Sequence, residues 1–152
     1  MPTHEQYFQM AAEEARKATC LRGKCGAVIV LNNEVIGSGF NAPPKNDEKS
    51  RKCALELVNS CKPKSDRTCC VHAEWRAIIE ALRTGKDLAG STLYFVRVDD
   101  AGNIKKSGEP YCTVCSRLAL DCGISFFGLW HESGIRLYDT KEYNDLSYAF
   151  HK

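Results

Sequence analysis

This chain is built around two segments: CCVHAE (residues 69–74) and EPYCTVC (residues 109–115). Each has the composition of a helix start. Cys112 and Cys115 are at i and i+3 and share one helix face, where two thiolates can hold a single ion. Pro110 suits a helix entrance because its missing N–H costs nothing there, and the positive end of the helix dipole lowers the pKa of a nearby thiol. We therefore predict a metal site at the second segment.

The first segment supplies the remaining groups of this site. His72 stands forty positions before Cys112 and offers an imidazole as a third ligand. Three protein ligands leave zinc one open tetrahedral position, which is the arrangement of a catalytic site. Glu74 does not easily share the direction of His72 toward the metal, but it can reach a water there and act as general base. We predict that His72, Cys112 and Cys115 bind Zn²⁺ and that Glu74 is catalytic.

The H-x-E pairing and the later C-x-x-C resemble the signature of the zinc-dependent cytidine and deoxycytidylate deaminase superfamily. The resemblance is strongest to its deoxycytidylate and tRNA-adenosine branches. One difference is that Tyr111 stands between Pro110 and Cys112, whereas the family places proline directly before the first cysteine. Because the C-x-x-C spacing is kept, we expect this residue to alter the rim that faces the substrate and to leave the metal site in place.

The resemblance implies hydrolytic deamination of a nucleobase. We expect the substrate to be cytosine in a free (deoxy)cytidine nucleotide or nucleoside, which gives the uracil product and ammonia. A first alternative is the deamination of adenosine in tRNA or of another amino-purine. A second is a non-catalytic, zinc-stabilised binding module, in which Cys69 or Cys70 closes the fourth zinc position. Resemblance also suggests a homo-oligomer, a dimer or larger.

Two sets of residues are candidates for contact with this substrate. The string IGSGFNAPP (residues 36–44) resembles the G-x-G-x-N segment of the family, so the resemblance implies that Asn41, together with Ala73, binds substrate. Taken alone, Asn41 is equally a turn residue before two prolines. Basic residues of the following insert could receive a substrate phosphate, although such a run also fits a solvated face. These residues are Lys45, Arg51, Lys64 and Arg67.

Charge and cysteine content limit the other possibilities. A net charge of +2 is too mild to indicate a nucleic-acid-binding surface. No apolar run has membrane-spanning length and the polar start lacks the apolar core of a signal peptide, so we expect a cytoplasmic protein without a membrane partner. The nine cysteines therefore favour metal binding or burial over disulfides. Some deoxycytidylate deaminases carry a second, structural zinc in this part of the chain, and the candidates for it are Cys53, Cys61, Cys69 and Cys70.

Periodicity and turn residues predict the order of the elements. An Asn32-Asn33 turn joins two strands into a hairpin, and a strand–helix–strand crossover predicts a parallel pair later in the chain. The expected helices are residues 4–19, a short one within 48–61, 72–85, 112–122 and 141–150. The expected strands are residues 25–31, 34–40, 91–98, 124–130 and 136–138.

These elements predict an α/β fold. We expect a three-layer α/β/α sandwich around a mixed sheet of about five strands. With 152 residues, 43% of them hydrophobic, the chain fits one domain over residues 1–152, with an irregular, cysteine-rich, basic insert at about residues 42–71. The resemblance to the deaminases covers most of residues 4–130 and implies the same fold.

Overall fold

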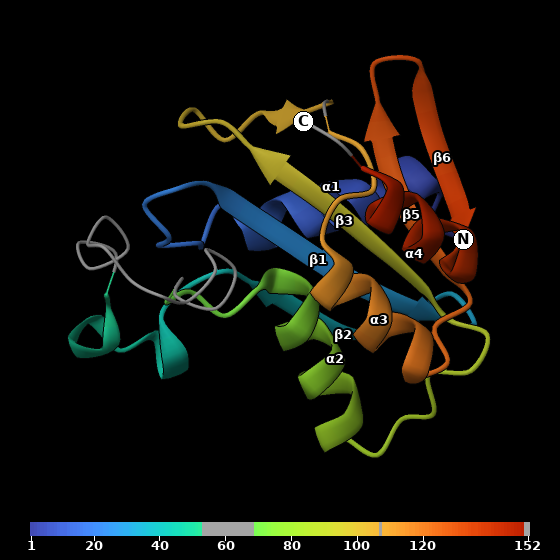
Figure 1. The fold of residues 1–152 in the computed structure, drawn as a ribbon, viewed down its shortest axis with the longest axis horizontal. Coiled ribbons are helices and arrows are strands. Elements are labelled where there is room, and N and C mark those ends of the chain that lie inside the picture. The colour runs from blue at the N-terminus through green and yellow to red at the C-terminus, as the bar shows by residue number, and fades with distance from the viewer. Residues whose placement is uncertain (53–68, 107, 151–152) are drawn as a thin grey trace.

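The computed structural model describes residues 1–52, 69–106 and 108–150. Its helices are α1 (His4–Ala15), α2 (Ala73–Arg83), α3 (Thr113–Asp121) and α4 (Thr140–Ala149), with two short 3₁₀ turns, η1 (Pro44–Asn46) and η2 (Glu48–Ser50) (Figure 1). Its strands are β1 (Lys24–Leu31), β2 (Glu34–Phe40), β3 (Thr92–Val98), β4 (Ile104–Lys105), β5 (Phe126–His131) and β6 (Gly134–Asp139).

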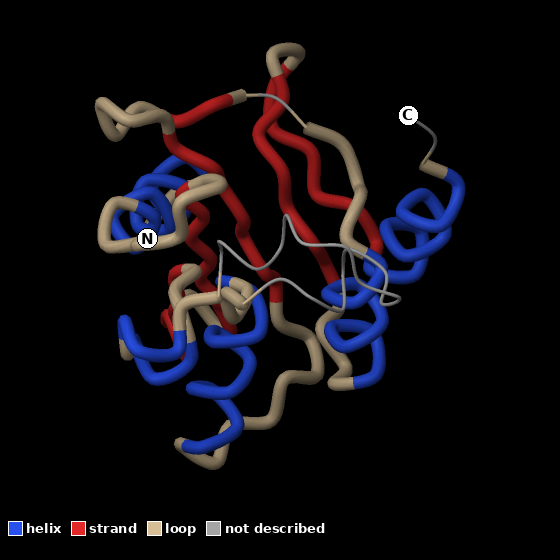
Figure 2. Tube along the Cα trace, turned by 60° about the vertical axis from the view of Figure 1, so that its left-hand side comes forward, coloured by secondary structure: helices blue, strands red, loops and turns tan. Residues whose placement is uncertain are grey.

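The strands, drawn in red in Figure 2, form one mixed sheet. Their order is β2-β1-β3-β5-β6, with β4 paired to the end of β3. β1 is antiparallel to β2 and β3, whereas β3 and β5 are parallel and are joined through α3. The predicted hairpin, central strand and parallel crossover are therefore confirmed. The short strand β4 was not predicted, because two residues carry too little pattern to be recognised as a strand.

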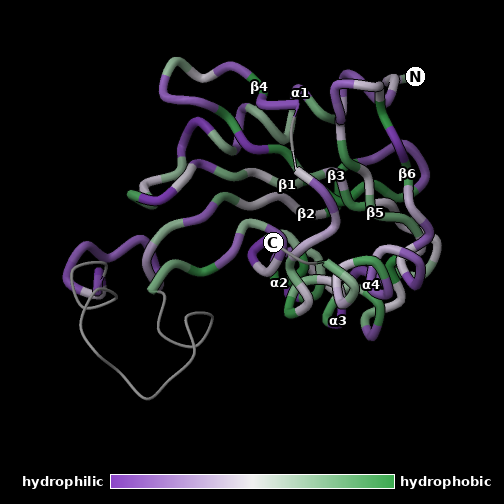
Figure 3. Tube along the Cα trace, turned by 45° about the horizontal axis from the view of Figure 1, so that its top comes forward, coloured by the Kyte–Doolittle hydropathy of each residue, from purple (hydrophilic) through white to green (hydrophobic). Residues whose placement is uncertain are grey.

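Helices cover both faces of the sheet, so the predicted three-layer architecture is confirmed (Figures 1 and 3). On one face, α1 buries Phe8 and Ala11 against Val28, Tyr94 and Val96. On the other face, α2, α3 and α4 pack over the same strands. The buried residues of this second layer include Ala27, Ile29, Ala77, Ile78, Leu93, Ala119, Phe127 and Tyr143.

Local signals in the sequence set several element boundaries. Thr3 and Gln6 form the capping box of α1, and Asn32 and Asn33 adopt the positive φ values of 51° and 66° that a tight hairpin turn requires. The first helix is shorter than predicted, because it ends at Ala15 and not at residue 19. The backbone beyond Ala15 turns away from the helix, and the Thr19 N–H donates to the carbonyl of Asn41 at the end of β2.

The last helix buries a different face from the one predicted. Tyr143 is buried as expected, but Leu146 is 40% exposed and Phe150 lies just beyond the end of α4. Thr140 and Ser147 are buried in their place, since they lie on the same helical face as Tyr143. Of the short helix predicted within residues 48–61, the structure describes only η2, and residues 53–61 lie outside the described ranges.

Two glycines of β2 let α2 pack directly on the sheet. A Cβ atom on Gly39 would lie 2.5 Å from the carbonyl oxygen of Ala73, and one on Gly37 would meet the carbonyl oxygen of Ala77. Both oxygens belong to the backbone of α2 and cannot move aside as a flexible side chain would. This close approach fixes the position of the helix start that follows His72. Among the described helices, none is long and apolar enough to cross a membrane.

Candidate metal centre and substrate cleft

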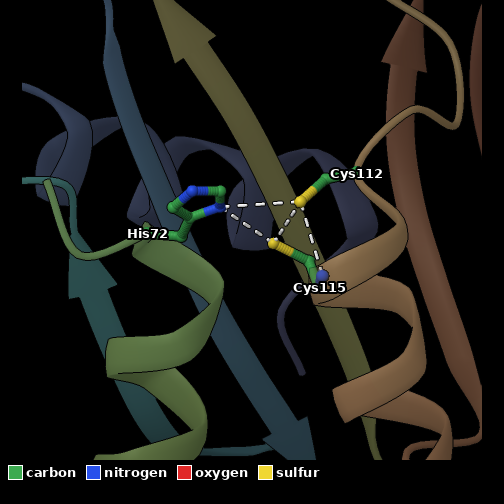
Figure 4. Close-up of side chains that lie close together, drawn as sticks. All are labelled: His72, Cys112 and Cys115. Atoms are coloured by element: carbon green, nitrogen blue, oxygen red, sulfur yellow. Dashed lines mark hydrogen bonds between the residues drawn. The ribbon is translucent and has the colours of Figure 1, made fainter. Parts of the chain in front are cut away.

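Two helix starts meet at one point above the sheet and bring together His72, Cys112 and Cys115 (Figure 4). His72 is the N-cap of α2, Cys112 is the N-cap of α3 and Cys115 lies in the first turn of α3. The Nδ1 atom of His72 is 3.1 Å from the Sγ of Cys115 and 3.6 Å from the Sγ of Cys112, and the two sulfurs are 2.9 Å apart. A single ion can therefore be reached by all three side chains.

The start of α3 explains how the chain accommodates Tyr111. Cys112 has extended backbone angles and its sulfur accepts a hydrogen bond from the Cys115 N–H, so the thiol itself caps the helix. The helix begins at Thr113, one residue later than predicted, and Pro110 therefore precedes the cap instead of occupying the first helical position. Tyr111 is 64% exposed and lines the cleft beside the metal ligands. It thus lies on the rim of the site without displacing either sulfur.

The three side chains share their protons unequally. The Cys115 thiol donates to the sulfur of Cys112, and this bond together with His72 lowers the pKa of Cys112 to about 4. Burial raises the pKa of Cys115 well above its ordinary value. Although burial opposes a charge on His72, the Cys112 thiolate and the Glu74 carboxylate raise the pKa of this imidazole. The cluster therefore combines one thiolate, one thiol and an imidazole.

This set of donors fits zinc. Zn²⁺ takes nitrogen and sulfur ligands, and three protein ligands leave one position for solvent or substrate. A bound cation removes the proton from a coordinating thiol, so the Cys115 proton does not oppose binding and would be released. Neither Cys69 nor Cys70 belongs to the group, which consists of His72, Cys112 and Cys115 among the described residues. These side chains form a three-ligand site and not the closed, four-ligand site of a zinc-stabilised binding module.

Glu74 lies in the first turn of α2 and is only 5% exposed. Burial raises the pKa of its carboxyl, and the nearby Cys112 thiolate acts in the same direction. Its side chain lines the cleft together with His72 and Cys112. A buried carboxyl with a raised pKa, beside a potential metal site, is well suited to accept a proton and to return it.

A cleft of about 590 Å³ opens over these residues, which is enough for a nucleotide-sized ligand. Ala73 and Asn41 both line it, as the proposed substrate contacts would require. The Asn41 side chain, however, already has partners: its Oδ1 accepts from the Cys25 N–H at 2.8 Å and its Nδ2 donates to the Gly23 carbonyl at 2.8 Å. The phenylalanine, tyrosine and tryptophan residues of the wall are Phe95, Tyr111, Trp130, Tyr143 and Phe150.

Among the described residues, the basic side chains that line this cleft differ from the predicted ones. Lys45 and Arg51 are absent from the lining, and Arg51 pairs with Glu48 at 2.7 Å. Lys64 and Arg67 lie outside the described residues, so their phosphate role stays a prediction. The cleft is lined instead by three other cations: Arg22, Arg97 and Lys105.

Strand pairing places two of these cations side by side. Arg97 of β3 is the register partner of Cys25 on β1 and of Lys105 on β4, so the three side chains form a row on one face of the sheet. The Arg97 guanidinium also lies close enough to the Cys25 thiol to hydrogen-bond to it. Arg97 and Lys105 do not stand out in the sequence, because only the pairing of β1, β3 and β4 brings them together at the cleft.

The candidates for a second zinc are only partly described. Cys53 and Cys61 lie outside the described residues, while Cys69 and Cys70 are half-buried. Burial and the neighbouring thiols of Cys20 and Cys69 raise the pKa of Cys70. The second zinc therefore stays a prediction.

Known proteins match both the sequence and the fold. The profile of the "Cytidine and deoxycytidylate deaminase zinc-binding region" matches residues 1–127. A deoxycytidylate deaminase of Mycobacterium phage D29 is 33% identical over 130 residues, which cover 81% of this chain and 91% of the relative. A deoxycytidylate deaminase of Schizosaccharomyces pombe is 27% identical over 132 residues, covering 84% of this chain and 35% of the relative. The chain thus spans most of the phage protein and about a third of the yeast one.

A solved structure supports the same fold. The dCMP deaminase of cyanophage S-TIM5 superposes with a TM-score of 0.58 at 21% identity, over 82% of this chain and 79% of that one. At this identity the likeness concerns the arrangement of sheet and helices. The profile and the phage relative go further, and they match the part of the chain that carries His72, Glu74 and the two cysteines of the metal centre. The chain therefore belongs to the cytidine and deoxycytidylate deaminase family, whose members bind zinc.

Proposed function

We propose that the protein deaminates deoxycytidylate in a zinc-dependent hydrolysis that yields deoxyuridylate and ammonia. The observation that carries this proposal is the composition of the cleft. It is lined by His72, Cys112 and the buried acid Glu74, and also by the cationic row of Arg97 and Lys105. The relatives from phage D29 and yeast bear the name of this activity, which supports the choice of substrate.

The cationic row is the feature that favours a nucleotide over a nucleoside. No ion pair joins Arg97 or Lys105 to a carboxylate within the described part of the chain. Guanidinium and ammonium groups are the natural partners of a phosphate, and a guanidinium can hold two of its oxygens at once. We assign the 5′-phosphate to Arg97 and Lys105, because Lys45 and Arg51 of the basic insert do not line the cleft.

The chemistry replaces the amine on ring carbon C4 by oxygen. Zinc held by His72, Cys112 and Cys115 would supply a Lewis acid that lowers the pKa of water toward neutrality. Glu74 moves the protons: its carboxylate takes one from water as the oxygen adds to C4 and delivers it to the ring nitrogen N3. It then takes the remaining hydroxyl proton and delivers it to the amine, which leaves as ammonia. Its raised pKa suits a group that must both accept and donate.

Ammonia release from a substrate panel tests this proposal. The panel contains cytosine, adenine and guanine as bases, nucleosides and 5′-monophosphates, with the zinc-loaded protein. We expect turnover of deoxycytidylate above all other members. Preferential release from an adenine or guanine compound, or no release from any member, would contradict the proposal.

The phosphate assignment is tested by Arg97→Gln. Because hydrogen bonds to charged groups contribute about 1.5–3 kcal/mol, we expect the KM for deoxycytidylate to rise at least about tenfold, with turnover of deoxycytidine unchanged. Arg83→Gln is the matched control, since Arg83 is exposed at the end of α2 and does not line the cleft. Equal rates for phosphorylated and bare deoxycytidine in the wild type would remove the phosphate role of the row.

A cytoplasmic location, a homo-oligomer and a single domain over the whole chain belong to the same proposal and stay predictions. Sedimentation of the purified protein measures the oligomeric state directly. We expect a dimer or a larger assembly, and a monomer at all concentrations would show this expectation to be wrong.

A further inference from the structure

Trp75 lies flat against the imidazole of His72. The two ring centroids are 4.1 Å apart and the ring planes differ by only 3°. His72 caps the start of α2 with extended backbone angles, and Trp75 is the third residue of that helix, so the indole returns over the ring that precedes it. The stacking is therefore built by the first turn of the helix that also carries Glu74.

Besides Trp75, the described residues hold the His72 imidazole by hydrogen-bond contacts at one ring nitrogen. Its Nδ1 faces the two sulfurs of Cys112 and Cys115. For its other ring nitrogen, the described residues provide no hydrogen-bond partner. A histidine that binds a metal usually donates its second N–H to a carboxylate or a carbonyl, which fixes the orientation of the ring. At His72 the contact that can do this is the face of Trp75.

Trp75 does not belong to the substrate cleft. It is absent from the residues that line the cleft, whereas His72, Ala73 and Glu74 on either side of the helix start are all part of that lining. Its indole N–H is buried without a hydrogen-bond partner among the described residues, so the ring is held by packing and not by a polar contact. This placement separates Trp75 from a role in stacking on the substrate base.

We propose that Trp75 is a positioning residue for the metal centre: its indole holds the His72 imidazole in the plane that directs Nδ1 toward Cys112 and Cys115. The proposal rests on the proposed function, because it assumes that His72 binds zinc. Parallel aromatic rings attract each other most strongly when one of them is electron-poor, and an imidazole becomes electron-poor when it binds a cation. The stack thus both orients the free ring and favours its metal-bound form.

Zinc affinity measured by competition with a chromogenic chelator tests this role without an activity assay. Partners of metal-bound histidines contribute about 10- to 100-fold to metal affinity, so we expect Trp75→Leu to bind zinc about tenfold more weakly. Trp75→Phe keeps an aromatic face and should recover most of the loss. Ile79→Ala is the matched control, because Ile79 lies one turn further along α2, is 44% exposed and does not contact His72. Equal zinc affinity of wild type and Trp75→Leu would overturn the proposal.

Steady-state kinetics separate positioning from substrate contact. Since Trp75 does not line the cleft, we expect kcat of zinc-loaded Trp75→Leu to fall while the KM for deoxycytidylate stays within about twofold of wild type, the pattern of a lost transition-state interaction. A raised KM with unchanged zinc affinity would instead make Trp75 a substrate contact and overturn the proposal. If Trp75→Leu does not fold, tryptophan emission decides. Zinc addition should change the emission of Trp130→Phe, in which Trp75 is the single tryptophan, and an unchanged emission would contradict the stack.

Different measurements rule out the proposed function and the positioning role of Trp75. A wild-type protein that binds no zinc or deaminates no panel member removes the proposed function. A wild type that does both, with Trp75 variants of equal zinc affinity, removes only the positioning role.

Discussion

Glu74 is a buried acid in the wall of the cleft, and its surroundings suit it to proton transfer. It is 5% exposed and faces both the Cys112 thiolate and the His72 imidazole, which act on its pKa in opposite directions. Burial outweighs the imidazole, so the pKa is raised. A carboxyl in this position can carry protons between water and a bound base, because its pKa is raised and it forms no ion pair with a described residue.

Glu74→Gln should therefore separate metal binding from turnover. The amide keeps the shape of the side chain but cannot accept a proton, so we expect kcat to fall by at least about 10²-fold while zinc content, measured by atomic absorption, stays at the wild-type level. Glu80→Gln is the control, because Glu80 lies on the exposed side of the same helix. Full activity in a zinc-loaded Glu74→Gln protein would remove Glu74 from the mechanism.

The residues of the metal centre could be predicted because they occur in short motifs with the spacing of metal ligands. The i, i+3 spacing of Cys112 and Cys115 and the pairing of His72 with Glu74 follow from helix geometry within one turn. The partners of Trp75 and Asn41 could not be predicted, since stacking and side-chain hydrogen bonds depend on angles that the sequence does not state. The residue type of Trp75 favours core packing over base stacking, and its contact with His72 appears only in three dimensions.

β2 and α2 pack more closely than ordinary side chains allow, and this contact aligns the metal centre. Gly37 and Gly39 place the sheet directly against the helix backbone at Ala77 and Ala73. Because His72 caps that helix, any shift of α2 away from the sheet moves the imidazole relative to the α3 cysteines. The G-x-G spacing, which the sequence associates with the substrate, thus also has a packing role.

Gly39→Ala is expected to disturb the site from outside the cleft. The added methyl meets backbone at 2.5 Å, so we expect a loss of about 1–3 kcal/mol in the free energy of unfolding, together with weaker zinc binding. Urea denaturation and chelator competition measure the two effects. Gly23→Ala serves as control, because its nearest neighbour is the flexible Arg97 side chain at 3.7 Å. Loss of stability with unchanged zinc affinity would show that α2 does not transmit the shift.

Element boundaries were predictable where capping residues set them and not where distant strands did. Thr3, Asn32-Asn33 and Gly123 act within a few residues and define a helix start, a turn and a helix end as expected. The first helix ends four residues earlier than predicted, and Thr19 bonds instead to Asn41, which follows β2. The strand β4 exists because a turn folds it onto β3, which short-range pattern does not reveal.

For the molecule as a whole, the order of the strands determines which charges meet in the cleft. Cys25, Arg97 and Lys105 come from β1, β3 and β4, and their alignment requires the antiparallel pairing of all three strands. These residues do not belong to a run of basic residues that the sequence would reveal. The basic insert does stand out in the sequence, but its residues Lys45 and Arg51 do not line the cleft. The sequence alone could therefore not predict this row, because the row depends on the register between strands that are distant in the chain.

Cys25, the buried member of this row, makes the stability of the whole protein sensitive to alkaline pH. Burial raises the pKa of Cys25 from 9.0 to about 11, so the folded protein keeps this thiol protonated after the unfolded chain has lost the proton. The stabilisation is fully present below pH 9 and is lost as the pH rises toward the folded value. We expect the free energy of unfolding to fall by about 1 kcal/mol between pH 8 and pH 10 from this group, measured by urea denaturation. Cys25→Ala should weaken this pH dependence, and an unchanged slope would contradict the assignment.

Asn41 is a position in the cleft wall where few other residues would be tolerated, because both ends of its side-chain amide are hydrogen-bonded. Its amide gives a hydrogen to Gly23 and takes one from Cys25, while its own backbone bonds to Cys25 and Thr19. Aspartate would lack the hydrogen to give, and glutamine would carry both groups one methylene too far. Substitutions that change the preferred sugar or base are therefore better tolerated at rim residues such as Tyr111 and Phe150. These two residues contact each other through their rings, and replacing them leaves the hydrogen bonds between Asn41 and β1 intact.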